Sequence, residues 1–420
     1  MVRYLGLDVH KYWTQVAWHL PDGSVQRERL ATDPVLLREL ADRLGPEDVV
    51  ALESTTNALA IATLLGQKAG RVLISNPLRT RLIAESHIKT DKVDADVLAQ
   101  LAKSGFLPAV WQPPQEVELL RRRSAYHDAL GREITRLKNR LHAVLHRHLI
   151  DAPVADLFSA KGRAFLKKAE LPADEQLQVE LDLHLLEVLE AARKEATKVL
   201  AHLAVAHPQV QLLMTVPGID YPTAVGILAA IGDISRFSQP AKLVSYFGLN
   251  PIVHQSAEHC YTGRISKRGR THARWLLVEA AHAAVRCPGP LRAFFLRIKA
   301  RKGTNVAVVA AARKLTVILF HMLTSGQPYR EAPQRTTHEK LCRLRYHATG
   351  RKERSGPLKG CSPSPFYGTG QRGRTVKARL DRQRLIELQR AYEEFVSQRL
   401  QEAYREEKPP ENSWHRHRYS

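Results

Sequence analysis

The sequence predicts an α/β domain at the N-terminus, followed by regions that are all-α. In the first 110 residues, short apolar runs rich in β-branched residues alternate with amphipathic segments. Beyond residue 111 the apolar residues recur at helical spacing instead. We expect four domains, at residues 1–110, 111–208, 209–330 and 331–420.

The first domain opens with three runs that predict strands, at Arg3–Val9, Tyr12–Leu20 and Ser24–Leu30. A Pro-Asp-Gly turn between the second and third indicates a hairpin. Asp33 and Pro34 are typical of a helix start, and the helix is expected to reach Leu44.

Two further strands and two further helices complete this domain. The strands are expected at Val49–Leu52 and Val72–Ser75, and the helices at Asn57–Ala69 and Lys92–Lys103. Three hairpin-linked strands followed by helix-linked strands predict a mixed sheet. That order is typical of an RNase H-like domain.

The second region predicts a pair of long helices. An apolar stripe favours a coiled coil or helical hairpin, at Leu130, Ile134, Leu137, Leu141 and Val144. Glu175–Ala206 predicts the second helix of the pair. The pair is interpreted either as a solvated element of one domain or as a subunit interface.

The third region begins with a turn between helices. Val216–Ile219 followed by Ala224–Ile231 resembles a helix-hairpin-helix, whose turn offers backbone N–H groups to a phosphate; a plain helix turn is the other interpretation. Further helices are expected at Pro240–Phe247, His272–Val285, Pro290–Ala300 and Asn305–Leu323. Beyond Pro333 the chain is poor in apolar residues, which predicts a flexible basic arm with a terminal helix at Leu380–Tyr404.

The charge indicates a polyanionic partner. The 420 residues carry a formal charge of +22. Residues 259–330 hold fourteen Lys and Arg but one acid, and residues 333–380 hold twelve but two acids, so the excess belongs to the C-terminal part. Without a 20-residue apolar run no membrane span is expected, and nucleic acid is the favoured partner. Four widely spaced cysteines and no secretory signal favour a reducing cytoplasm.

Four acids of the first domain are candidates for a metal site. Asp8 lies inside an apolar strand, where an unpartnered carboxylate is costly, and Glu53 ends another strand. Asp91 and Asp94 are three residues apart, so they share a helix face. Carboxylates suit Mg²⁺, which takes its other ligands from water and substrate phosphates. Taken singly, Asp91, Asp94 and Glu53 also fit a helix cap, a first-turn acid and a loop residue.

Several motifs together resemble one protein family. They are Leu5–Lys11, Leu52–Thr55 and Lys89–Ala95, then Val216–Ile219, Leu243–Pro251, Gln255-Ser256 and Gly263–Gly269. In order and spacing they resemble the D-E-D-D insertion-sequence transposases and Piv-like DNA invertases, a RuvC-like recombinase family. The resemblance covers about Arg3 to Leu323.

The resemblance implies the site and its chemistry. It implies that Asp8, Glu53, Asp91 and Asp94 bind Mg²⁺ and that Ser256 attacks the scissile phosphate, forming a phosphoserine link to DNA. Ser266 is the rival nucleophile. It also implies double-stranded DNA as substrate, a structured guide RNA, homodimers or homotetramers, and a prokaryotic, nucleoid-associated location.

Clustered cations are the expected nucleic-acid contacts. They lie beside the candidate serine, at Arg264, Lys267, Arg268, Arg270 and Arg274, and at the start of the long helix, at Arg121, Arg122 and Arg123. Two alternatives remain open at this stage. One is a metal-dependent, structure-specific nuclease without a covalent serine, and the other is a catalytically inactive nucleic-acid-binding protein.

Overall fold

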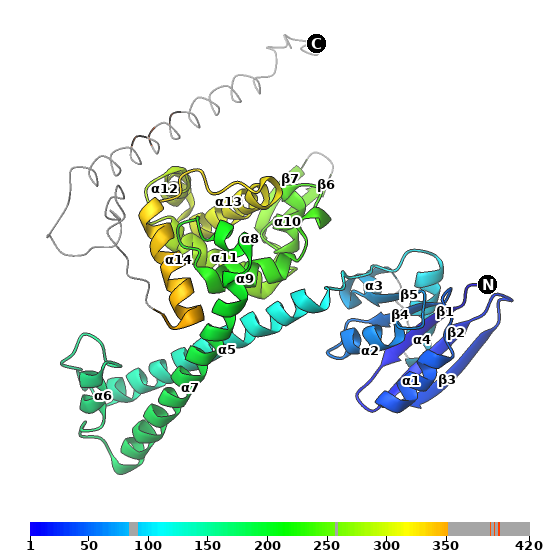
Figure 1. Ribbon diagram of the computed structural model, residues 1–420, viewed down its shortest axis with the longest axis horizontal. Coiled ribbons are helices and arrows are strands. Elements are labelled where there is room, and N and C mark those ends of the chain that lie inside the picture. The colour runs from blue at the N-terminus through cyan, green and yellow to red at the C-terminus, as the bar shows by residue number, and fades with distance from the viewer. Residues whose placement is uncertain (84–90, 257–258, 352–386, 388–389, 391–393, 395–420) are drawn as a thin grey trace, which may run out of the picture. The chain divides into compact units, whose positions relative to one another are not determined.

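The chain forms two compact units, Met1–Pro114 and Gln115–Ser420. Figure 1 shows the computed structural model from which both are described. It describes residues 1–83, 91–256, 259–351, 387, 390 and 394, with the side chains of 91, 92, 256, 259 and 260 excepted. The expected terminal helix at 380–404 lies outside the described residues apart from three positions.

A five-stranded mixed sheet forms the first unit. Its strands are β1 (Tyr4–Val9), β2 (Trp13–His19), β3 (Val25–Ala31), β4 (Val49–Glu53) and β5 (Arg71–Ser75), in the spatial order β3-β2-β1-β4-β5. The first three strands are antiparallel neighbours, whereas β4 runs parallel to both β1 and β5. This arrangement confirms the mixed-sheet, RNase H-like fold.

Helices cover both faces of this sheet. Alternation along β1 sends Leu5 and Leu7 into a core shared with α1 (Pro34–Asp42) and α2 (Ala58–Leu65). Asp33 caps α1 as predicted, because its carboxylate accepts from the backbone N of Val35 at 2.7 Å. A short helix that the sequence did not predict, α3 (Pro77–Ile83), follows β5.

The opposite face is covered by α4 (Asp91–Lys103), which packs on β1, β2 and β4. Leu98 and Ala102 of α4 cover Ala51 of β4. Gly6 permits the close approach to β1, because a Cβ there would lie 1.8 Å from the carbonyl oxygen of Ala95 and 2.7 Å from the backbone N of Ala99. The helix therefore rests directly on the backbone of β1.

Two antiparallel helices, α5 (Gln115–Arg147) and α7 (Ala173–Val205), open the second unit. Figure 1 shows them as a long hairpin with α6 (Ala160–Leu166) at its tip. The predicted stripe is buried, at Leu130, Ile134, Leu137, Leu141 and Val144. Arg140 of α5 pairs with the buried carboxylate of Asp182 on α7. The helical hairpin is thus confirmed.

The remaining helices pack into one core at the other end of this hairpin. They are α8 (Pro208–Leu213), α9 (Tyr221–Ile231), the 3₁₀ turn η1 (Ile234–Arg236), α10 (Pro240–Tyr246), α11 (Thr271–Ala284), α12 (Pro290–Lys302), α13 (Thr304–Ser325) and α14 (Gln334–Thr349). Between α10 and α11 the chain forms the strands β6 (Pro251–Ser256) and β7 (His259–Ile265), whose described side chains lie outside this core. By length and composition alone, α13 is apolar enough to cross a membrane. Its apolar side chains, however, fill the centre of this core, where α10, α11 and α12 pack against it.

Two segments differ from the sequence prediction. Residues 251–256 and 259–265, expected to lie in an all-α domain, form the antiparallel ribbon β6–β7. Residues 334–349, expected in the flexible arm, form α14, which packs on α7 and contributes Leu344 and Ala348 to the core. Lys340 anchors this helix: its buried Nζ donates to the carbonyls of Met214, Val216 and Ile219 at 2.6, 2.8 and 2.9 Å. Burial lowers the pKa of Lys340 to about 8.

The same contacts correct the phosphate-binding interpretation of the 216–219 turn. Its carbonyls face the Lys340 ammonium, and Val216 and Ile219 are buried. Gly218, at φ +84°, packs so closely on α11 that a Cβ would lie 2.6 Å from the carbonyl oxygen of Ala280. The turn is a buried junction between helices, because α11 and α14 already occupy its surroundings.

The close contact at Gly6 generates a prediction about α4. Gly6→Ala forces β1 and α4 apart, and overpacking of this kind costs about 1–3 kcal/mol. Hydrogen exchange followed by mass spectrometry should show faster exchange at residues 94–103 in this variant. Gly45→Ala is the matched control, because a Cβ there meets only the Asp48 carboxylate, at 3.8 Å. Equal protection of α4 in both variants would contradict the role given to Gly6.

Candidate functional site

Asp8 and Glu53 lie side by side at the sheet edge. The parallel strands β1 and β4 pair in register up to Leu7 and Leu52, and the two acids are the next residues of their strands. Carboxyl ends of parallel strands meet at one edge, so both carboxylates follow a shared, rigid backbone. The Asp8 side chain is only 16% exposed. An acid this enclosed needs partners.

One partner of Asp8 is a residue to which the sequence analysis gave no role. The Nε2 atom of His10 lies 3.0 Å from the Asp8 Oδ2 atom, and its ring stacks on Trp13 at a centroid distance of 4.0 Å. The spacing Asp-x-His at the end of a strand was the available signal, since residues i and i+2 of an extended chain share a face. His10 therefore orients the Asp8 carboxylate.

The other two predicted acids belong to the first turn of α4. Asp94 is half-buried, and Asp91 is the first residue of the helix, its side chain lying outside the description. A nearby acid, Asp96, is bound elsewhere, because Arg27 of β3 approaches its carboxylate at 2.7 Å. Since Ala95 rests on Gly6, the first turn of α4 lies on the same sheet face as Asp8 and Glu53.

The donor set at this face suits a hard divalent cation. Among the described side chains, no group of three or more His, Cys, Asp or Glu residues is close enough to hold a metal ion. Asp8 and Glu53 alone match the way Mg²⁺ binds, through one or two carboxylates with substrate phosphates supplying further oxygens. The residues present therefore fit such an ion.

The two candidate serines lie at opposite ends of the β6–β7 ribbon. Ser256 pairs with His259 in the last described pair of the ribbon, and its side chain lies outside the description. Ser266 follows β7 at the base, where its backbone N donates to the carbonyl of Asn250 at 2.8 Å. Between them the ribbon is exposed, with His254 stacked on Tyr261 at 4.9 Å. Of the two serines, Ser256 is the one at the end of the ribbon opposite this base.

The loop after β7 is fixed to the end of α10. The backbone N of Lys267 donates to the carbonyl of Gly248, and that of Arg270 to the carbonyl of Tyr246. Gly269, at φ +141°, permits this packing, because a Cβ would lie 2.3 Å from the Tyr246 carbonyl oxygen. The motifs at 243–251 and 263–269 therefore form one rigid base for the ribbon.

The eight predicted nucleic-acid contacts divide into two groups. Six are exposed: Arg122, Arg123, Arg264, Lys267, Arg268 and Arg270. The other two bind backbone. Arg274 donates to the carbonyls of Phe247 and Lys267, and Arg121, with a side chain only 13% exposed, donates to the carbonyls of Ala229 and Ala230. The sequence alone cannot separate the two groups, because both appear in it only as clusters of positively charged residues.

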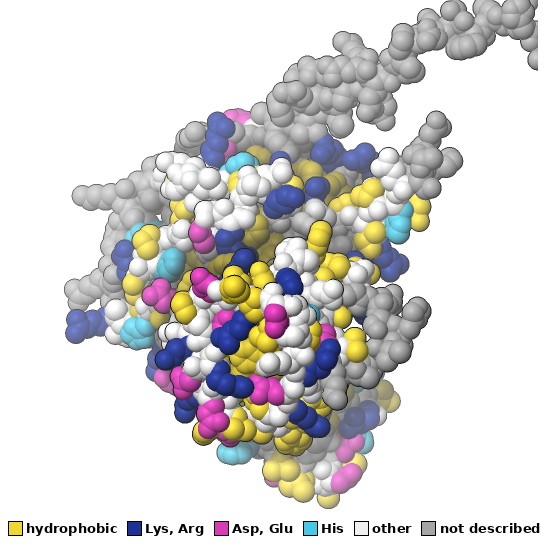
Figure 2. Space-filling view, turned by 90° about the vertical axis from the view of Figure 1, so that its right-hand side faces the viewer, with side chains coloured by type: hydrophobic (Ala, Val, Ile, Leu, Met, Phe, Trp, Pro, Cys, Tyr) yellow, Lys and Arg dark blue, Asp and Glu magenta, His cyan; other side chains and the backbone are white. Residues whose placement is uncertain are grey.

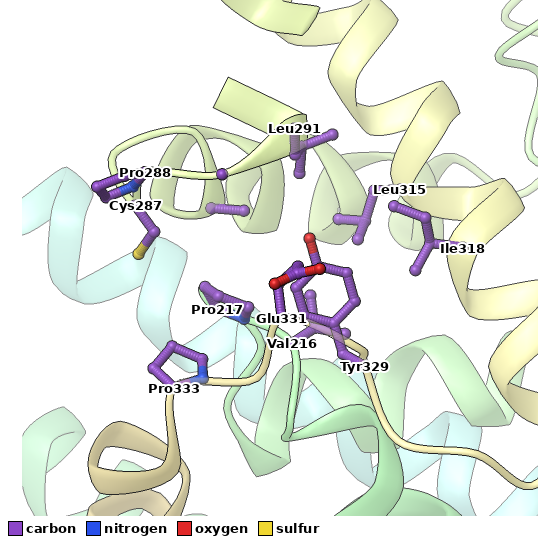
Figure 3. Close-up of a pocket in the computed structure, with 12 residues that line it drawn as sticks. Val216, Pro217, Cys287, Pro288, Leu291, Leu315, Ile318, Tyr329, Glu331 and Pro333 are labelled. Atoms are coloured by element: carbon purple, nitrogen blue, oxygen red, sulfur yellow. The ribbon is translucent and has the colours of Figure 1, made fainter. Parts of the chain in front are cut away.

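A small apolar pocket in the second unit contains none of these residues. Figure 3 shows Tyr329 and Glu331 lying between Val216-Pro217 and the side chains of Leu291, Leu315 and Ile318. Its volume of about 20 Å³ has room for a water molecule but not for a nucleotide. On the face drawn in Figure 2, Lys and Arg side chains are interspersed with Asp and Glu. Neither feature competes with the acids or the ribbon as a site.

Comparison with known proteins identifies the family of the chain. Residues 5–150 match the DEDD transposase family of IS110, and residues 210–296 match the family described as "Transposase IS116/IS110/IS902 family". The chain belongs to the IS110/IS116/IS902 family of transposases. The two matches contain the acids Asp8, Glu53, Asp91 and Asp94 and the serine Ser256, respectively.

Individual transposases agree with this assignment. The chain is 27% identical over 297 residues to the transposase for insertion sequence element IS1111A of Coxiella burnetii, covering 66% of this chain and 82% of that one. It is 27% identical over 296 residues to the IS1328 transposase of Yersinia enterocolitica, covering 67% and 85%. The pilin gene-inverting protein of Moraxella bovis is 27% identical over 271 residues, covering 62% and 74%. The chain is thus a DNA strand-transfer enzyme whose DEDD domain implies a divalent metal ion.

Proposed function

We propose that this transposase cuts and rejoins DNA at a mobile element by Mg²⁺-dependent, serine-mediated strand transfer, guided by a structured RNA. The observation that carries the proposal is the pair Asp8 and Glu53 on adjacent strand ends, beneath a helix that begins with Asp91 and Asp94. In a transposase this acidic face is the place for metal-assisted phosphoryl transfer.

In this proposal Asp8, Glu53, Asp91 and Asp94 hold Mg²⁺. When bound, the ion polarises a phosphodiester and offsets charge on the attacking and leaving oxygens. The protein's own part is to keep these carboxylates in place, and His10 does so for Asp8 at 3.0 Å. The sheet edge supplies rigidity, which a loop would not.

Ser256 is the proposed nucleophile, and its place at the ribbon tip supports this choice over Ser266 at the base. Its Oγ loses a proton and bonds to phosphorus while the bond from phosphorus to the departing sugar oxygen breaks, and that oxygen gains a proton. The resulting phosphoserine ester preserves the bond energy for rejoining. Attack by a new strand end reverses the step and frees the serine.

Double-stranded DNA is the proposed substrate, and a structured RNA the proposed guide. The exposed cations of the 264–270 loop and of α5, together with the +22 charge, support contacts to nucleic-acid backbones. Base pairing between this RNA and the DNA would then select the DNA sequence, because protein contacts to the backbone carry no sequence information. The proposed location is the prokaryotic cytoplasm, at the nucleoid, and the matched relatives named above are bacterial.

We further propose a homodimer or homotetramer assembled through α7. Four apolar side chains on the outer face of this helix are 44% to 61% exposed, at Leu177, Leu181, Leu185 and Val188. Their spacings of four, four and three residues form a continuous stripe, as in the face that one helix offers to another. A second copy of α7 supplies a matching apolar surface.

The metal proposal predicts the behaviour of Asp8→Asn. Strand cleavage by this variant should fall by more than about 100-fold, because replacing even a residue that only hydrogen-bonds to a metal ligand lowers activity about 10–100-fold. Its DNA affinity should be retained. Gel assays of cleavage and binding, with and without Mg²⁺, measure both. Asp22→Asn, an exposed acid in the β2–β3 turn, is the control with wild-type activity. Wild-type cleavage by Asp8→Asn would remove this acid from the metal site.

The serine proposal predicts a covalent adduct. With a nicked DNA substrate that traps the intermediate, wild type and Ser266→Ala should form a protein–DNA species stable to denaturant, and Ser256→Ala should form none. An adduct formed by Ser256→Ala but not by Ser266→Ala would transfer the role to Ser266. Cleavage without any adduct in wild type would identify a metal-dependent nuclease instead.

The assembly proposal predicts the effect of charge on the α7 stripe. Leu181→Glu combined with Leu185→Glu should shift the mass in solution toward the 47.3 kDa monomer, as measured by light scattering. Leu149→Glu is the control, because Leu149 is 89% exposed and lies outside the stripe. An assembly that persists unchanged in the double variant would show that copies associate elsewhere.

A further inference from the structure

Tyr246, the last residue of α10, is surrounded by guanidinium groups, of which only the Arg270 group belongs to the exposed cations invoked above. Arg270 donates from Nε to the Tyr246 hydroxyl at 2.9 Å, and its guanidinium carbon lies 5.9 Å from the ring centre. The guanidinium carbon of Arg236 lies 5.4 Å from the same ring centre. Two cations from separate segments thus converge on one phenol.

A third guanidinium stands behind them at the C-terminal end of α9. Arg121 of α5 donates to the carbonyls of Ala229 and Ala230 at 2.7 and 3.2 Å, and the Tyr246 hydroxyl donates to the Ala230 carbonyl at 3.2 Å. Arg236 donates to the next carbonyl along α9, that of Ile231, at 2.6 Å. The cluster is therefore built on rigid secondary structure.

Three guanidinium groups, those of Arg121, Arg236 and Arg270, are close enough to influence one another. Glu118 approaches Arg121 only to 3.9 Å, and Asp233, near Arg236, accepts hydrogen bonds from Ser235. The helix dipole of α9 contributes about half a negative charge. Burial and the neighbouring Arg270 hold the pKa of Arg121 below its ordinary value. An added anion would relieve this repulsion.

The Tyr246 hydroxyl responds to the same field. Burial raises the pKa of its phenol, but Arg270, Arg121 and Arg236 outweigh that effect and hold the pKa below its ordinary value. Its single O–H is donated to the Ala230 carbonyl, so the hydroxyl fixes Arg270 to the end of α9. Arg270 is exposed, while Arg236 and Tyr246 are half-buried, so the cluster is accessible from one side.

We infer that Arg236 and Arg270, positioned by Tyr246 and backed by Arg121, form a binding site for one phosphodiester group of a nucleic-acid backbone. Guanidinium groups bind phosphate oxygens through their N–H donors, and the Tyr246 hydroxyl, which accepts from Arg270 and donates to the Ala230 carbonyl, holds Arg270 in place. Arg270 continues directly from the exposed cations Arg264, Lys267 and Arg268, so a strand that follows the ribbon base reaches this site. The inference rests on the nucleic-acid-binding function proposed above.

The salt dependence of binding tests this inference, because each neutralised phosphate contributes about 0.9 to the slope of log K against log salt for duplex DNA and about 0.7 for single strands. The probes are a 30-bp DNA duplex and a 30-nucleotide RNA. Arg236→Gln combined with Arg270→Gln should reduce the magnitude of this slope by the contribution of one phosphate and not of two, because both side chains bind the same phosphate. Tyr246→Phe should weaken binding at fixed salt but keep the slope.

Two variants protect the test against misfolding and non-specific charge effects. Arg270→Gln alone leaves the contacts of Arg121 and Arg236 to α9 intact, so it should fold even if the double variant does not, and it should reduce affinity several-fold. Arg330→Gln removes an arginine that is 93% exposed and lies 3.8 Å from Glu331, and its slope should match wild type.

The outcomes separate this inference from the proposed function. A reduced slope with DNA alone assigns the phosphate to DNA, and with RNA alone to RNA; either supports the site. A slope that is unchanged with both probes overturns the phosphate site, and so does a reduction by the contribution of two phosphates. Either result leaves nucleic-acid binding in place. Wild-type protein that binds neither probe overturns both proposals.

Discussion

The contact between Gly6 and α4 is the constraint on which the first unit depends. A helix can rest on the backbone of β1 only because position 6 lacks a Cβ, which would lie 1.8 Å from the Ala95 carbonyl oxygen. That contact sets the first turn of α4, with Asp91 and Asp94, on the sheet face that carries Asp8 and Glu53. Arg27 adds a second restraint by pairing with Asp96 at 2.7 Å. Acids 86 positions apart in sequence, from Asp8 to Asp94, thus come to one face through packing.

Charge is divided between the parts of the molecule according to their chemistry. The acidic face belongs to a unit without excess positive charge, where a cation is needed before a phosphate can approach. The excess cations lie in the second unit, and there they serve two purposes. Some, such as Arg264 and Arg268, are exposed and are the proposed contacts to nucleic acid, whereas Arg121, Arg274 and Lys340 donate hydrogen bonds to backbone carbonyls and hold helices together.

The sequence predicted those features that rest on local periodicity or local chemistry. The mixed sheet, the Asp33 cap and the buried stripe of α5 followed from alternation, capping and helical spacing. The β6–β7 ribbon escaped prediction because it is exposed on both faces and so lacks the apolar alternation of a half-buried strand. The helix α14 escaped because a buried lysine anchors it in place of a run of apolar residues. The arginines that bind backbone carbonyls also escaped prediction, because a partner can lie more than 100 positions away in the sequence. Arg121 and Ala229 are an example.

The central claim is that the acids of β1, β4 and α4 form one divalent-metal site. Replacing Mg²⁺ with Fe²⁺ and adding ascorbate and peroxide generates hydroxyl radicals that cut the backbone nearest the bound ion, and mass spectrometry locates the cuts. We expect cuts close to residues 8, 53 and 91–94, suppressed by excess Mg²⁺ and lost in Asp8→Asn. Cuts confined to other segments, or a pattern that Asp8→Asn leaves unchanged, would contradict the claim.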